Sequence, residues 1–162
     1  MIGTSVVTAC TALIAALQAD PVLSAAGVAV SYAAPQVPED LKSDDGDFEA
    51  IWLGDADETE TIPVLTGGHL HRDETIRQQL IVQVLKPYSD GTQHAADTRA
   101  VEILTRVQDV LANNADLGVT DPARFEAVLT GWKLVRGFLG NTQGHGSRFE
   151  AAVELTARLT PS

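Results

Sequence analysis

His69 and His71 are the residues best placed for chemistry, because they form a His-x-His pair directly after Gly67 and Gly68. Two imidazoles at alternate positions of a strand share one face and could hold a transition metal if an acid at position 73 or 74 joined them. No third ligand has a convincing spacing. We therefore expect no metal site, and we interpret the pair as part of a polar loop or of a contact between subunits.

Little else in the sequence indicates a catalytic nucleophile or a phosphate-binding loop. Cys10 is the only cysteine, which excludes an internal disulfide and a cysteine-based zinc site. It falls on the apolar stripe of the first expected helix, so we expect a buried thiol rather than a nucleophile. Neither a Gly-x-Ser-x-Gly elbow nor a Gly-x-x-x-x-Gly-Lys phosphate loop occurs in the sequence. We expect no catalytic residue, no cofactor and no enzymatic activity.

Acidic side chains gather in one stretch of the chain. Residues 39–60 contain ten acids and one base, Lys42, so they carry −9 of the formal net charge of −11. The acids are Glu39, Asp40, Asp44, Asp45, Asp47, Glu49, Asp55, Asp57, Glu58 and Glu60. They lack the alternating ligands and distal glutamate of a calcium loop. Such a charge argues against stable binding to nucleic acid, which needs lysine and arginine against phosphate.

The elements that would position these residues follow from periodicity. Helices are expected at residues 4–19 and 93–114, with a short turn at 21–26. Strands are expected at residues 28–32, 48–53, 74–86, 125–139 and 147–159, the last two joined by a glycine-rich turn into a hairpin. Acidic loops are expected at about 33–47 and 54–73, although residues 54–73 could equally form a hairpin arm. The result is a single α+β domain over residues 1–162, with both helices packed on a mostly antiparallel sheet.

Three patterns make specific statements about which side chains are buried. In the helix at 93–114, one apolar stripe shares a face: Ala96, Ala100, Ile103, Leu104, Val107 and Leu111. In the strand at 147–159, the apolar residues alternate: Phe149, Ala151, Val153, Leu155, Ala157 and Leu159. In the strand at 125–139, simple alternation places four residues on one face: Val128, Thr130, Trp132 and Leu134.

The most apolar part of the N-terminal region does not indicate a membrane segment. Thr8 and Thr11 interrupt residues 6–17, no basic residue precedes them, and the stretch is too short to cross a bilayer. We expect neither a signal peptide nor a membrane anchor, and a start in the cytoplasm.

The order of elements resembles the tail terminator family of long-tailed bacteriophages, which includes related tail-completion and minor tail proteins. The resemblance covers nearly the whole chain. It is carried by VVTACTALIAALQADPVL, the acidic loop before EAIWLGDA, TIRQQLIVQVLKP, ADTRAVEILTRVQDVLA and FEAVLTGWKLVRGFLGNTQGHGSRFEAAVELTARLTP.

The resemblance implies a structural protein of the virion, at the head-proximal end of the tail, assembled in the host cytoplasm. Members of this family form a ring, usually a hexameric ring, that caps the tail tube and stops polymerisation of the tail tube protein. The ring joins the head–tail connector, and DNA passes through its lumen without specific binding. Alternatives are a connector adaptor or neck protein, a tail tube subunit, or, less in keeping with the pattern, a small ligand-binding or enzymatic domain.

A ring would give the acidic stretch a role at the lumen, where it would repel phosphate, or at an interface between subunits. The alternative is that these acids only keep a loop soluble. Residues 54–73 would order on assembly, with glycine hinges, or would be an ordinary surface loop. The candidate lumen or interface residues are Glu39, Asp40, Asp44, Asp45, Asp47, Asp55, Asp57, Glu58, Glu60, Gly67, Gly68, His69 and His71.

Overall fold

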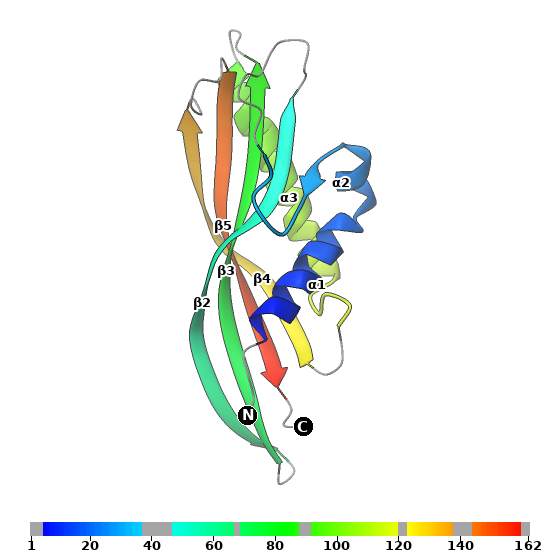
Figure 1. Cartoon of the computed structure of the whole chain (residues 1–162), viewed down its shortest axis with the longest axis vertical. Coiled ribbons are helices and arrows are strands. Elements are labelled where there is room, and N and C mark those ends of the chain that lie inside the picture. The colour runs from blue at the N-terminus through cyan, green and yellow to red at the C-terminus, as the bar shows by residue number, and fades with distance from the viewer. Residues whose placement is uncertain are drawn as a thin grey trace.

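Helices cover one face of a long, twisted, five-stranded sheet (Figure 1). The computed structural model describes residues 5–36, 47–66, 69–87, 92–119, 123–137 and 144–159. The elements are α1 (Val6–Gln18), α2 (Pro21–Ala25), β1 (Ala29–Val30), β2 (Phe48–Thr66), β3 (His69–Pro87), α3 (Thr92–Asn113), β4 (Ala123–Gly137) and β5 (Gly144–Leu159). The strand order is β1-β2-β3-β5-β4, and only the short β1–β2 pairing is parallel. The predicted α+β class and the closing β4–β5 hairpin are confirmed.

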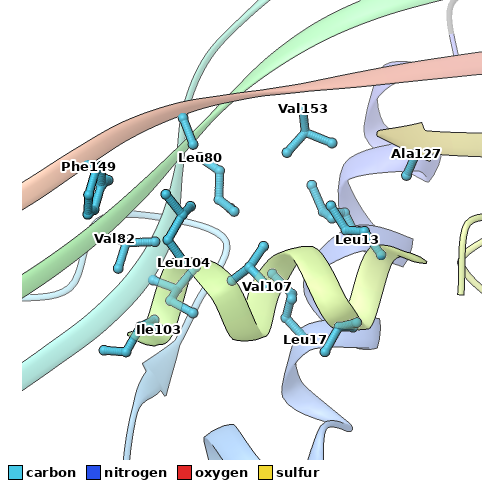
Figure 2. Close-up of a cluster of buried hydrophobic side chains, with 14 of the residues drawn as sticks. Leu13, Leu17, Leu80, Val82, Ile103, Leu104, Val107, Ala127, Phe149 and Val153 are labelled. Atoms are coloured by element: carbon cyan, nitrogen blue, oxygen red, sulfur yellow. The ribbon is translucent and has the colours of Figure 1, made fainter. Parts of the chain in front are cut away.

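The core lies between the sheet and the helices α1 and α3 (Figure 2). All six residues of the predicted stripe on α3 are buried, and Val110 joins them. They meet Leu80 of β3, Val153 of β5 and Leu13 of α1, each fully buried. A helix whose apolar residues recur every three or four positions can bury one whole face in this way, which is why the pattern predicted α3 to within a residue at each end.

The central strand β5 shows its predicted alternation, and its neighbour β3 alternates in step with it. Phe149, Ala151 and Val153 of β5 face the helices, and β3 places Val82, Leu80 and Gln78 opposite them in register. Leu155 and Ala157 continue this buried row, as predicted. β5 begins at Gly144 rather than at residue 147. His145, which was expected in the turn, therefore pairs with Lys86 of β3.

A second, smaller cluster of buried side chains lies on the opposite face of the sheet. It contains Ala50 and Trp52 of β2 and Ile81 of β3, with Phe48 packed against it. Ile51, between them in sequence, belongs to the main core. Alternate residues of β2 between 48 and 53 therefore point to opposite faces, and both faces of this part of the sheet are buried.

The prediction of a loop between residues 54 and 73 is wrong. The described residues of this stretch form a hairpin arm, which was the alternative. β2 continues from Phe48 to Thr66 and pairs with β3 up to the pair Thr66–His69. The sequence pattern did not predict this part of the strand because the register of β2 shifts twice, between Leu53 and Ala56 and between Glu58 and Glu60. Each shift breaks the two-residue period that a sequence pattern needs. Residues 56–58, 60–66 and 69–73 are already paired within a single chain.

The predicted alternation in β4 is also wrong from its middle onward. A register shift between Leu129 and Gly131 inserts one extra residue into β4. Trp132 and Leu134 then pair with Ala151 and Phe149, which point toward the helices. Because a bulge moves every later side chain to the other face, Val128 and Trp132 do not share a face as expected.

Candidate functional site

The described acids of the predicted lumen or interface set lie on one edge of the sheet. Asp55, Asp57 and Glu58 belong to β2 and are exposed. β1 pairs with β2 only at Ala50 and Ile51. After Leu53, whose N–H donates to the carbonyl of Tyr32 (3.3 Å), the outer side of β2 has no partner strand among the described residues. The structure therefore places these acids on a free strand edge rather than in a loop.

The other predicted site residues are spread more widely. Asp47 precedes β2 and forms an ion pair with Lys86 of β3. Glu60 lies on β2, and His69 and His71 lie on β3, opposite Thr66 and Val64. The remaining predicted positions fall outside the described residues: Glu39, Asp40, Asp44, Asp45, Gly67 and Gly68. Over the described part of the chain, no group of histidine, cysteine, aspartate and glutamate side chains could hold a metal ion.

The opposite edge of the sheet is formed by β4 and has a different character. Trp132 is 62% exposed, Val128 48% and Val135 38%, and Lys133 between them is exposed as well. The ring of Trp132 packs edge-on against Phe149, with centroids 5.3 Å apart. The N-terminal part of this edge is covered, because Ala127 N–H donates to the carbonyl of Ala115 (2.8 Å). The later part presents apolar and basic side chains.

Sequence reasoning missed this β4 edge. Its only signal was the combination of large apolar residues with lysine and arginine in one strand, which also fits a strand at the centre of a sheet. The sequence does contain a second difference, which is the charge of the two edge strands. β2 contains five acids and no lysine or arginine, whereas β4 contains three basic residues and one acid.

A polar cluster joins the start of α3 to the β4–β5 hairpin. Gln93 Nε2 donates to Ser147 Oγ (3.1 Å), to Gly146 O (3.1 Å) and to Asp97 Oδ1 (3.0 Å). Arg136 Nε donates to Asp97 Oδ2 (2.7 Å), and Ser147 Oγ also donates to Asp97. Burial acts to raise the pKa of Asp97, but hydrogen bonds from Ser147, Arg136 and Gln93 outweigh it, so the pKa lies below its usual value. The hydroxyl of Ser147 faces a carboxylate within a satisfied network, which fixes structure.

An open groove of about 690 Å³ lies at the C-terminal end of α3. Three of its charged residues are already engaged: Arg158 Nε donates to Asp73 Oδ1 (3.1 Å), and Asp116 Oδ1 accepts from Gly118 N–H (2.9 Å). A substrate site usually presents converging polar groups that remain available to a ligand. These contacts stabilise the protein itself.

The fold is similar to that of a chain in a solved virus-like particle. No protein-family model matches the sequence, and no curated protein matches it. The structure aligns with a chain from the virion of a native gene transfer agent particle with a TM-score of 0.58 and 19% identity. The alignment covers 96% of this chain and 99% of that chain. At this identity, the likeness shows a shared fold over the whole chain.

The helices of the described residues are not suited to a bilayer: none is both long enough and apolar enough to cross one.

Proposed function

We propose that the protein is a structural component of a phage-like virion and acts as a ring-forming tail terminator, without catalytic activity. The observation that carries this proposal is the fold shared, over nearly all of both chains, with a component of the gene transfer agent virion. The order of the elements supports the narrower role, since it resembles the tail terminator family. The two unlike sheet edges add support. Neither β2 beyond Leu53 nor the later part of β4 has an outer partner strand among the described residues, and a ring needs two different surfaces that fit each other.

In this role the ring caps the tail tube, stops polymerisation of the tail tube protein and presents its other side to the head–tail connector. The family resemblance favours six subunits. Six copies of a chain with net charge −11 carry a formal charge of −66 (6 × −11). A field of this sign would let DNA pass through the lumen without adhering to it.

In such a ring, the acids of residues 39–60 have two locations open to them, a contact between subunits and the lumen. Asp55, Asp57 and Glu58 lie on the β2 edge, a position suited to a contact between subunits. The acids of residues 39–45 remain our candidates for the lumen. Replacing those acids with their amides should make the ring retain DNA and slow its passage. Unchanged DNA passage through normally assembled rings would remove the acids from the lumen.

Electron microscopy of the purified protein, alone and mixed with the tail tube protein, tests the terminator role. We expect rings that sit at one end of each tube, and tubes shorter than those formed by the tube protein alone. Rings that bind connector but leave tube length unchanged would indicate an adaptor or neck protein. Filaments formed by the protein alone would indicate a tube subunit, and a monomer that ignores tubes would contradict a structural role.

A further inference from the structure

We infer that the acidic edge of β2 in one copy docks against the basic and apolar edge of β4 in a second copy. Asp55, Asp57 and Glu58 form the first surface, called here the acidic edge. Trp132, Lys133 and neighbouring Val128 and Val135 form the second, called here the tryptophan edge. This inference rests on the proposed ring and names the surfaces that build it.

The acidic edge and the tryptophan edge cannot contact each other within one chain. β2 and β4 are separated by β3 and β5 in the strand order, and neighbouring strands lie about 4.8 Å apart, so about 14 Å of sheet separates the edges. The register places Asp57 beside Arg77 of β3, and Lys133 beside Glu150 of β5. A direct contact between Asp57 and Lys133 therefore requires two copies.

The charges of the two edges are complementary. Asp55, Asp57 and Lys133 are exposed and have no ion-pair partner among the residues that the structure describes. By contrast, Arg136 is already paired with Asp97. Opposite charges steer association and fix its register, while like charges that meet across an interface are rejected.

The tryptophan edge also offers an anchor. Trp132 is supported on one side by Phe149 and remains 62% exposed. Val128 and Val135, which lie on the opposite face of β4, are exposed as well. Tryptophan is among the residue types that contribute most binding energy at protein interfaces. Docking would remove this apolar surface from water.

The acids and bulges on β2 also restrict which partner can bind. Charged residues and bulges on an edge strand discourage pairing with strands at random. A contact between two β2 edges would bring acids against acids, whereas a β2–β4 contact joins unlike surfaces. A contact of unlike surfaces is head-to-tail, and such contacts close into rings when the rotation between copies permits. The preferred contact is thus the one that produces a ring.

Zero-length cross-linking tests the contact directly. A carbodiimide joins a carboxylate to a lysine amine as an amide only when the two groups touch. Mixed light and isotopically heavy protein should give a light–heavy cross-link between Lys133 and an acid of the acidic edge. Peptides that link Lys133 only to other acids, or no mixed link at all, would overturn the inference.

Charge exchange provides a second test with a matched design. Asp57→Lys and Lys133→Glu should each weaken ring assembly by about tenfold at each contact, measured by mass photometry over a dilution series. The combined variant should recover assembly, because the charges are exchanged and not removed. Lys133→Arg and Asp109→Lys, which changes an exposed position of α3, are controls that should assemble as the parent does at about 0.1 M salt, where repulsion between copies is largely screened.

The outcomes separate this inference from the proposed function. Rings that still cap tubes in both single variants would overturn the β2–β4 contact and leave the terminator role intact. A parent protein that forms neither rings nor caps would overturn the terminator role. The cross-linking result would still decide whether two copies meet through these edges.

Discussion

Asp20 shows how one side chain fixes two helices. Its carboxylate accepts a hydrogen bond from Leu23 N–H (3.0 Å) as the N-cap of α2. It also accepts two from Arg106 on α3, through Nε (3.0 Å) and Nη2 (2.5 Å). The hydrogen bonds from Arg106 lower the pKa of Asp20, with a smaller contribution from the capping amide. The sequence indicated only that Asp20 precedes Pro21, since its partner lies 86 positions away.

Substitutions at Asp20 separate the cap from the ion pair. Asp20→Ala should lower the free energy of unfolding by at least about 1 kcal/mol, the usual cost of losing an N-cap. Asp20→Asn keeps a capping oxygen and loses the charge, so it should fall between Asp20→Ala and the parent. Urea denaturation at pH 7 measures both. Equal stability of the asparagine and alanine variants would mean that the cap contributes nothing.

The same pair predicts a dependence on pH. A carboxyl whose folded pKa is lowered stabilises the fold above its unfolded pKa of about 3.9, and this stabilisation is lost as the pH falls through the lower folded value. The stability difference between parent and Asp20→Asn should therefore shrink in urea titrations stepped downward from pH 5. Asp97 also has a lowered pKa, but it is present in both proteins and cancels. A difference that stays constant to pH 2 would contradict the assignment.

At the scale of elements, the sequence predicted what is buried and missed what lies at an edge. α3 and β5 were found nearly in full, and β3 from residue 74 onward, because each buries a regular apolar face against the core. β2 was predicted to end at residue 53, yet it continues to Thr66. Beyond Leu53 it is an edge strand with bulges and acids, so no apolar alternation marks it.

For the candidate site, the sequence indicated a group of acidic residues but not where they lie in the fold. Asp55, Asp57 and Glu58 were assigned to a loop, whereas they belong to β2. The tryptophan edge was not identified, since the bulge before Gly131 reverses which residues face outward. Neither a bulge nor an edge follows from the types of neighbouring residues alone, because both depend on which strands pair.

The buried stripe of α3 predicts a large contrast between neighbouring positions. Ile103 is 1% exposed within the core, whereas Val101 on the other side of the helix is 49% exposed. Ile103→Ala should cost about 2–5 kcal/mol, through lost burial and the cavity left behind. Val101→Ala should change stability by no more than about 0.5 kcal/mol. Chemical denaturation of both variants checks this, and similar losses at the two positions would contradict the placement of α3.

The bulge in β4 makes a prediction about register. Thr130 is the extra residue between the paired positions Leu129 and Gly131. Because Thr130 is the extra residue, deleting it should remove the bulge and let Gly131 follow Leu129 directly. Gly131 and Trp132 would still pair with Ala152 and Ala151, so Trp132 should stay on the side of Phe149.

We expect the Thr130 deletion to keep the contact between Trp132 and Phe149. The near-ultraviolet circular dichroism signal of Trp132 should match that of Thr130→Ala, a control of unchanged length. Loss of this signal in the deletion variant alone would contradict the assignment of Thr130 as the extra residue.

At the scale of the whole molecule, the sheet has two functions. Its helix-covered face supplies the core, and its two ends supply unlike edges that do not meet within the chain. This division explains why the most periodic segments carry stability and the least periodic ones carry the proposed assembly. Selection for a contact between copies can change edge residues without disturbing the core beneath them.

Salt should act on assembly in two opposing ways, and their ranges decide which prevails. Copies with net charge −11 repel one another, and this repulsion acts over the Debye length, about 30 Å at 0.01 M salt and about 10 Å at 0.1 M. The proposed contact between Asp57 and Lys133 acts at about 4 Å, so it is screened much less over the same range. We therefore expect ring formation to increase between about 0.01 M and about 0.1 M salt, and to weaken near 1 M, where the Debye length is about 3 Å.

Mass photometry at one protein concentration across this salt series measures the effect, and charge variants separate its two causes. The combined Asp57→Lys and Lys133→Glu variant keeps the net charge of −11, so its low-salt response should match that of the parent. Asp109→Lys reduces the magnitude of the net charge by two without touching either edge, so its rings should form at lower salt. Assembly that only decreases from the lowest salt upward would show that short-range attraction prevails throughout, and that the net charge of the chain does not oppose ring formation.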